Sequence, residues 1–437
     1  MNTRRGLMIL TLLGTTACGV HGEMKLEDGG PPLTGVLQQN IRGPSNCAQP
    51  PDVDGGTVAA VVAGNSKLAL QLFGQLAAAN AGQNIFLSPY SVSTAMTMAY
   101  EGADTTTATQ MAQILDYPAL GNQKLAAGFG ALACQIEANG LAPDGGQVDV
   151  ANAVFGQTGE TFEQPFTTTL ETEFGAPFTP VEFATDPDGV RQEINKWVSN
   201  QTDSMIPQLL SPGSIDSSMR LVLVDALYFN ENWETPFDPA TTGAFHVNAQ
   251  TTIQVPLMTD AVLDARYYSD ATVTMAEIPF QNGNEAIDFL LPGTGGGTLA
   301  DLDAALTAPK LQGWFAGLTK TSVLVTIPKF KVDWASNLIP AFQALGLALP
   351  FDSTQADFSG IDGAKDLFIS LLQHEAVLTV QESGVTAAAA TAVGIAGNAA
   401  PQWNETFSAT QPFIVVLRDV PTGTLLFIGQ VTNPSGS

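Results

Sequence analysis

The sequence predicts an α+β fold, because segments with helical patterning alternate with strand-like segments. Apolar residues at mixed three- and four-residue spacing over residues 61–79 favour a helix, and residues 194–198 favour another. Residues 221–229 are almost continuously apolar, as expected for a strand buried on both faces of a sheet. No internal repeat and no second linker interrupts residues 57–437, which we therefore assign to one large domain.

Residues 1–17 have the pattern of an export signal. Arginines precede an apolar core over residues 6–13, and small residues precede Cys18. The apolar core is too short to cross a bilayer as a helix. The residues around Cys18 resemble a bacterial lipoprotein cleavage box, although a threonine stands where such boxes usually have leucine. Two outcomes stay open, namely lipid attachment at Cys18 and ordinary cleavage after Ala17.

Residues 18–56 predict a flexible tether, because they are rich in Gly, Pro, Asp and Gln and show little apolar periodicity. If Cys18 carries lipid, the remaining cysteines, Cys47 and Cys134, make an even pair that suits an oxidising compartment. The sequence does not show whether these two cysteines meet. We expect an exported protein that is either extracellular or anchored to the cell envelope as a lipoprotein.

The net charge of −26, from 16 basic and 42 acidic residues, argues against two classes of partner. Nucleic acids and anionic membrane surfaces both require clustered cations on the protein. We therefore expect no nucleic-acid partner, and contact with a membrane only through a lipid anchor.

The sequence also argues against an enzyme. Its histidines are His21, His246 and His374, and it contains no Gly-x-Ser-x-Gly elbow. His374 and Glu375 lack the second histidine of a zinc-binding helix, and the cysteines are too sparse for a metal cluster. We expect no cofactor and no metal, although counting residues does not address a pair of catalytic carboxylates.

Residues 84–103 predict a strand followed by a helix. The strand is expected to stop at Pro89, and Ser88 is expected to cap the helix, since serine is a good N-cap and proline suits the first helical turn. Further along, residues 152–155 fit a strand, and Trp197 is expected to point inward from its helix.

Residues 382–401 have no clear preference for helix or strand. Four consecutive alanines favour a helix, but glycines interrupt it and β-branched residues favour a strand. Between Ser383 and Ala400 there is neither a charge nor a proline, so the segment can enter a sheet without burying an ion or losing a hydrogen-bond donor. This composition fits a switch between loop and strand, and it also fits a plain surface linker.

The sequence on both sides of this segment closely resembles the C-terminal third of the serpins. Residues 382–390 begin with an acidic residue, a variable one and glycine and continue into alanines, as in the serpin hinge. Residues 427–434 read Phe-Ile-Gly-Gln-Val-Thr-Asn-Pro, which fits the signature Phe-x-Gly-x-Val-x-Asn-Pro. The resemblance covers about residues 59–434. It implies the serpin fold, in which helices pack around three β-sheets with a large central mixed sheet and an exposed reactive-centre loop, here about residues 382–405.

The resemblance implies suicide inhibition of a protease. In that mechanism the target attacks a bond of the loop, and the cut loop inserts into the central sheet as a strand. Side chains that point inward must be small and uncharged, because they enter a close-packed layer. The hinge assigned by resemblance comprises Glu382, Gly384, Val385, Ala387, Ala388, Ala389, Ala390 and Thr391, and its inward positions meet this requirement. The alternative is a non-inhibitory serpin, with a chaperone, binding or storage role, that a protease cuts as a simple substrate.

The family's usual spacing from Glu382 places the reactive bond between Asn398 and Ala399. The alternatives are Ala399–Ala400 and Ile395–Ala396. No Lys or Arg lies between Glu382 and Arg418, so a trypsin-like target would find nothing to bind. Small and apolar residues suit elastase-like or subtilisin-like serine proteases, and the asparagine would also suit an asparagine-selective cysteine protease.

Residues 129–139 resemble the heparin-binding helix of the family but carry no cation. They would repel a polyanion, so we expect no heparin partner. The protein is expected to act as a monomer whose partner is the target protease.

The resemblance also implies two structural sites in the central sheet. The shutter beneath the sheet comprises Ser88, Ser91, Asp225 and His374, and the breach, where the loop first enters, contains Trp233. Asp225 stands where the family usually has asparagine, and Glu375 stands where it commonly has lysine. A buried carboxylate beside an imidazole would favour the charged histidine, and loop insertion would then depend on pH. A partly hydrated Asp225 would have no such effect, and both possibilities stay open.

Overall fold

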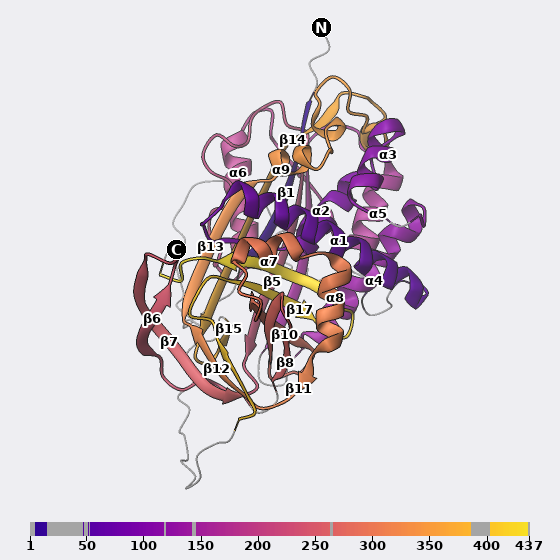
Figure 1. Cartoon of the computed structure of the whole chain (residues 1–437). Coiled ribbons are helices and arrows are strands. Elements are labelled where there is room, and N and C mark those ends of the chain that lie inside the picture. Colours follow the sequence, from indigo (N-terminus) through magenta and orange to yellow (C-terminus); the bar gives the residue numbers. More distant parts are fainter. Residues whose placement is uncertain are drawn as a thin grey trace.

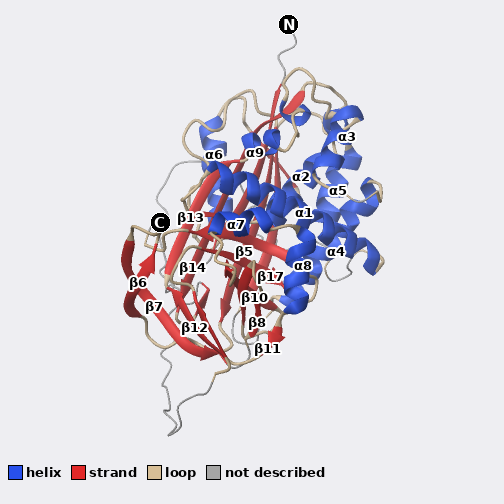
Figure 2. Ribbon diagram, viewed as in Figure 1, coloured by secondary structure: helices blue, strands red, loops and turns tan. Residues whose placement is uncertain are grey.

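The computed structural model describes residues 5–14, 47, 51, 53–117, 119–141, 146–262, 265–385 and 403–435. Its helices are α1 (Gly55–Ala79), α2 (Pro89–Tyr100), α3 (Thr105–Ile114), α4 (Asn122–Asn139), α5 (Gln164–Phe174), α6 (Pro187–Gln201), α7 (Leu299–Ala305), α8 (Ala308–Gly317), α9 (Ile339–Ala344) and α10 (Ser359–Asp362), with a 3-10 turn at Leu349–Phe351. Figure 2 shows that α1, α3, α4 and α5 gather along one flank of the molecule, while the long strands lie beside them. Helices and three β-sheets together confirm the α+β class.

Local capping determines where the first two helices begin. The Asp54 carboxylate accepts a hydrogen bond from a backbone amide of the first turn at 2.8 Å, so α1 begins at Gly55 and not at the predicted residue 61. The Ser88 hydroxyl accepts a similar bond at 3.1 Å, and α2 begins at Pro89 as predicted.

The central sheet is mixed, as predicted. It contains β1 (Arg5–Gly14), β3 (Gln147–Gln157), β4 (Phe178–Val181), β5 (Leu221–Asn232), β13 (Phe330–Asn337), β14 (Leu367–Gln381) and β15 (Gly384–Val385). β3 pairs antiparallel with β5, and β13 pairs antiparallel with β14. β1 lies between β5 and β14 and runs parallel to both.

β5 is buried on both of its faces, as its apolar sequence predicts. Leu223 and Leu227 pack into the main core, whereas Val222 and Val224 pack into a second core that contains Trp197 of α6. Trp197 therefore points inward, as predicted. The alternation along β5 shows that the central sheet is covered on both sides at this level.

The other two sheets lie around the central one. The second sheet contains β2 (Ile85–Leu87), β8 (Arg266–Ser269), β9 (Val273–Pro279), β10 (Glu285–Pro292), β11 (Thr319–Lys320), β17 (Phe413–Asp419) and β18 (Thr424–Val431). The third contains β6 (Thr241–His246), β7 (Thr252–Val262), β12 (Val323–Pro328) and β16 (Glu405–Ser408). The Phe229 ring on β5 meets the Phe427 ring on β18 edge-on at 6.4 Å, so the first two sheets touch through aromatic side chains.

Part of the segment that the sequence assigns to an export signal forms β1 in the middle of the central sheet (Figure 1). Its pairing with β14 begins with Arg5 opposite Leu367, and its pairing with β5 begins with Leu7 opposite Leu221. This pairing was not predicted. An uncharged apolar run of this length suits a buried strand as well as an export signal, so its pattern fits both.

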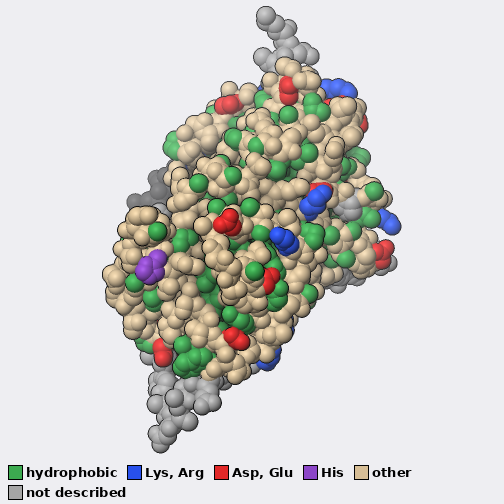
Figure 3. All heavy atoms as spheres, viewed as in Figure 1, with side chains coloured by type: hydrophobic (Ala, Val, Ile, Leu, Met, Phe, Trp, Pro, Cys, Tyr) green, Lys and Arg blue, Asp and Glu red, His purple; other side chains and the backbone are tan. Residues whose placement is uncertain are grey.

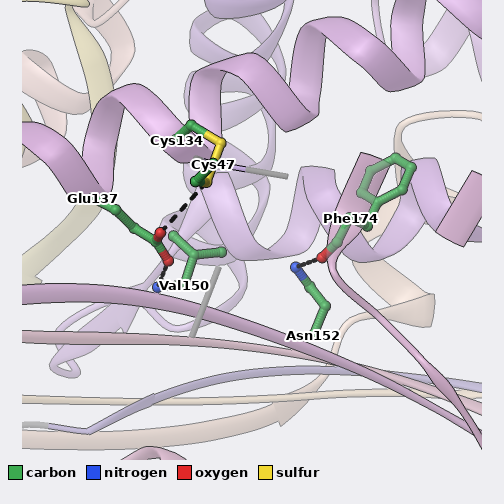
Figure 4. The surroundings of a disulfide bond; sticks show 6 residues. All are labelled: Cys47, Cys134, Glu137, Val150, Asn152 and Phe174. Atoms are coloured by element: carbon green, nitrogen blue, oxygen red, sulfur yellow. Dashed lines mark hydrogen bonds between the residues drawn. A yellow bond between two sulfur atoms is a disulfide. The ribbon is translucent and has the colours of Figure 1, made fainter. Parts of the chain in front are cut away.

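Cys47 and Cys134 form a disulfide, which answers the question that the sequence left open (Figure 4). Their Cα atoms lie 5.2 Å apart. Cys134 lies on α4, so the bond attaches residue 47, within the predicted tether, to this helix. α4 is in turn attached to the central sheet, because the Glu137 carboxylate accepts a hydrogen bond from the Val150 amide of β3 at 3.2 Å.

Candidate functional site

The first hinge residues already form a strand of the central sheet. Gly384 and Val385 make up β15, which pairs antiparallel with β14 on one side and with β5 on the other. Val385 is fully buried. A Cβ atom at Gly384 would lie 2.3 Å from the carbonyl oxygen of Glu231, so β5 approaches too closely for any side chain at this position.

Glu382 is held in place just before β15. Its carbonyl accepts a hydrogen bond from the Phe237 amide at 2.8 Å, and its carboxylate accepts one from the Ala240 amide at 3.3 Å. The same carboxylate forms an ion pair with Lys329 at 2.9 Å. Partial burial would raise the pKa of Glu382, but these bonds outweigh it and leave that pKa below its usual range.

Trp233 joins the end of β5 to the turn that leads into β15. Its indole nitrogen donates to the Gln381 carbonyl at 2.8 Å, and its backbone amide donates to the Ser383 carbonyl at 3.0 Å. The indole is buried and stacks on Phe280 with ring centroids 5.0 Å apart. Trp233 thus lies where β15 enters the sheet, at the position that the sequence assigned to the breach.

Below the breach lies a pair of buried carboxylates that sequence reasoning missed. The Asn282 side-chain amide donates to Glu231 at 2.9 Å and also to Glu285. Burial raises the pKa of Glu285 to about 7, because it disfavours the charged carboxylate. The available signal was Glu231 itself, an acidic residue near the end of an otherwise apolar strand.

Ser88, Ser91 and His374 meet beneath the central sheet. The Ser88 amide donates to His374 Nε2 at 3.2 Å, and the Ser88 hydroxyl donates to the Leu426 carbonyl at 2.8 Å. A ring nitrogen that accepts a hydrogen bond carries no proton, so this arrangement belongs to a neutral imidazole. It does not fit the charged histidine that the sequence left possible.

Asp225 is fully buried, and the Ser91 hydroxyl lies beside its carboxyl and opposes part of the effect of burial. Burial raises the pKa of its carboxyl well above the usual range, which favours the neutral acid. The partly hydrated carboxylate that the sequence left possible is therefore wrong. Asp225 and His374 both lie opposite Thr11 of β1, so the structure places them on either side of β1 and does not bring them together.

Glu375, the other departure from the family, lies beside His374 on β14. Burial raises the pKa of its carboxyl to about 7, the negative charge of Asp333 adds to the shift, and Lys331 opposes it. The remaining predicted site residues lie outside the described part of the chain. They are Cys18, Ala387, Ala388, Ala389, Ala390, Thr391, Ile395, Asn398, Ala399 and Ala400.

Within the described ranges, no cluster of three or more His, Cys, Asp or Glu side chains could hold a metal ion. No helix among the described residues has the length and apolar character needed to cross a membrane. On the face drawn in Figure 3, Lys and Arg side chains stand singly and do not form a cluster. The stretch of α4 over residues 129–139 carries no cation.

The fold and this site define a class of protein whose central sheet takes up a further strand from its own chain, between β5 and β14. A family model described as Serpin (serine protease inhibitor) matches residues 63–434. The chain belongs to the serpin family.

Relatives and solved structures agree with this assignment. The chain is 35% identical to leukocyte elastase inhibitor A of Rattus norvegicus, over 85% of this chain and 98% of the relative. It is 31% identical to antithrombin-III of Mus musculus, over 85% of this chain and 81% of the relative. The structure is similar to human glycosylated kallistatin, with a TM-score of 0.76 and 26% identity over 88% of this chain and 100% of the other. It is also similar to native protease nexin-1 with heparin, with a TM-score of 0.72 and 28% identity over 86% and 99% of the two chains.

Proposed function

We propose that this chain is a suicide inhibitor that traps a protease by inserting its cut loop into the central sheet. The observation that carries the proposal is β15, which pairs with both β14 and β5 and so begins the strand that insertion would complete. The residues that follow carry neither charge nor proline up to Ala400. Extending β15 therefore buries no ion and loses no hydrogen-bond donor.

Trapping begins with ordinary proteolytic chemistry. The oxygen of the target's catalytic serine attacks the carbonyl carbon of the reactive bond, and the peptide C–N bond breaks. The proton from the serine passes to the departing amine, and an ester joins the loop to the protease. Insertion of about fifteen residues at roughly 3.3 Å each would then move the protease about 50 Å along the sheet. The resulting distortion of the protease prevents hydrolysis of the ester.

The target belongs to the elastase-like or subtilisin-like serine proteases. We place the reactive bond between Asn398 and Ala399, where small and apolar residues fit a small specificity pocket and no Lys or Arg is present. The similarity to leukocyte elastase inhibitor A supports this class. An asparagine-selective cysteine protease is the second candidate, because of the asparagine at the proposed bond.

The protein acts outside the cytoplasm as a monomer. Residues 1–17 direct its export, and it is then extracellular or held at the cell envelope by lipid on Cys18. The disulfide between Cys47 and Cys134 supports an oxidising compartment. The absence of cations over residues 129–139 argues against heparin as a partner.

The test is to mix the processed chain, residues 18–437, with pancreatic elastase and with subtilisin, and to run a denaturing gel. We expect a covalent band at the summed mass that survives SDS. Asn398→Arg in the same chain serves as a control, because residue 398 supplies the carbonyl of the proposed bond and fills the specificity pocket, so an arginine there should weaken the reaction with elastase and create a site for trypsin. Cleavage of the loop without any covalent band would instead identify a simple substrate and a non-inhibitory serpin.

A further inference from the structure

The space between β5 and β14 holds two different segments of this chain, one at each end. β15 enters it at the breach and runs antiparallel to both neighbours. β1 fills it from the opposite end and runs parallel to both. We call this space the slot. It is the place that an inserted loop would have to occupy.

The register shows that the two segments meet inside the slot. On β5, Gly14 of β1 lies opposite Tyr228, and Val385 of β15 lies opposite Glu231. Only Phe229 and the residue after it separate these two positions. Since an antiparallel strand pairs residue for residue, the loop can add residues 386 and 387 before residue 388 would coincide with the end of β1.

The two segments share the chemistry that the slot requires. The sequence from Gly6 to Gly14 has no charge and no proline, and the same is true from Ser383 to Ala400. A segment without charge or proline can lie between two buried strands and pair with both. Either segment can therefore fill the slot. Beyond the first residues of the hinge, the two cannot occupy it at the same time.

β1 also separates residues of the shutter. Asp225 and His374 both lie opposite Thr11, so one strand width is inserted between β5 and β14 at this level. The sheet is thus already expanded by a strand at its centre, which is the geometry expected after loop insertion. An expanded sheet has no place left for a second strand.

From these observations we propose that the N-terminal segment Arg5–Gly14 is an autoinhibitory strand, which blocks loop insertion until it is removed. The inference rests on the proposed function, because blocking matters only if the loop inserts. While β1 is in place, a protease that cuts the loop is not trapped. Cleavage after residue 17 turns β1 into a separate peptide that can dissociate from the slot, and the inhibitor is active once this peptide has left.

The experiment uses the full chain and a variant that disrupts β1 alone. Successive amides of a strand point to opposite neighbours, so Ile9→Pro with Leu10→Pro removes one hydrogen-bond donor toward β5 and one toward β14. Thr16→Pro, which lies beyond the end of β1, is the matched control. Three measurements are made on each chain: hydrogen exchange of residues 5–14, covalent complex with elastase and subtilisin, and the shift in melting temperature after the loop is nicked.

In the unmodified chain and in the Thr16→Pro control, we expect amides of residues 5–14 to exchange at least about a hundredfold more slowly than in the free peptide. Nicking the loop should leave the melting temperature of both chains unchanged. In the double variant we expect fast exchange, a higher melting temperature after nicking, and at least about tenfold more covalent complex. Excess synthetic peptide of residues 5–14 should reverse the effect of the double variant, which also shows that this variant is folded.

Fast exchange of residues 5–14 in the unmodified chain would overturn the inference, as would equal melting shifts in the unmodified chain and the double variant. A different result would overturn only the proposed function. If nicking raises the melting temperature of the double variant but no chain forms a covalent complex, then β1 blocks insertion and the protein does not trap these proteases.

Discussion

The breach and the shutter lie in the same sheet, but their polar groups are satisfied to very different extents. At the breach, the Trp233 indole and the Glu382 carboxylate both have hydrogen-bond partners. In the shutter, the Asp225 carboxyl is fully buried, and the Ser91 hydroxyl beside it offsets only part of the effect of that burial. A buried carboxyl that is only partly compensated costs free energy, so the polar groups of the shutter are less well stabilised than those of the breach. The difference indicates that the sheet is held firmly where β15 enters and less firmly at the level of Asp225.

The largest expected effect is at the breach and tests whether Trp233 is its main support. Trp233→Ala removes a buried indole together with its stacking on Phe280, and should lower the free energy of unfolding by about 3–5 kcal/mol. Trp403→Ala is the control, because Trp403 is 42% exposed and its loss should change stability by less than about 0.5 kcal/mol. Urea unfolding of both variants measures this, and equal losses would contradict the assignment.

The next effect tests the close approach of the hinge to β5. Gly384→Ala places a Cβ 2.3 Å from the Glu231 carbonyl oxygen, so it should destabilise the protein by about 1–3 kcal/mol and weaken the pairing of β15. Gly74→Ala, in α1 with no atom within 4 Å of the added Cβ, should instead stabilise the protein by up to about 1 kcal/mol. Thermal unfolding of the two variants compares them. A neutral Gly384→Ala would show that β15 tolerates a side chain.

The third prediction is that the contribution of Asp225 in the shutter to the stability of the protein depends on pH. Because burial raises the pKa of Asp225 above its unfolded value of 3.8, the carboxyl favours the folded state at low pH, and this contribution is lost as the pH rises. Asp225→Asn removes this dependence, so its stability relative to the unmodified protein should increase from pH 4 upward, by at most about 1.4 kcal/mol per pH unit. Melting temperatures from pH 4 to pH 8 test the trend. A difference that does not change with pH would show that Asp225 does not titrate in this way.

The smallest effect concerns the exposed ion pair that holds Glu382. The two side chains are 43% and 30% exposed, so Lys329→Ala should cost less than about 1 kcal/mol. The difference from the unmodified protein should shrink further in 1 M salt, which screens exposed charges. A loss of several kcal/mol would show that the breach depends on this pair more than on Trp233.

Local chemistry made some of these features predictable from the sequence. Ser88 and Pro89 mark the start of a helix through capping and φ preference alone, and the structure has that start. The continuous apolar run of β5 predicted burial on both faces, because a strand with one face in water would alternate apolar and polar residues. These elements follow from residues that are neighbours in the chain.

Features that depend on distant pairing were not predictable. The pattern of residues 5–14 suits an export signal and a central strand equally. Only the strand pairing in the folded structure shows that this segment lies opposite Asp225 and His374. The sequence suggested that these two side chains meet, but it has no means of showing that a strand lies between them. The disulfide partner of Cys47 was unknown for the same reason.

The disulfide has a consequence for a protein that meets proteases. It closes a covalent ring across 87 positions of the chain, which contains α1, β2, α2, α3 and most of α4. A single cut anywhere inside this ring separates no fragment, because both new ends stay joined through sulfur. A single proteolytic cut in this region therefore leaves the two parts of the chain covalently joined, and a reductant is needed before they can separate.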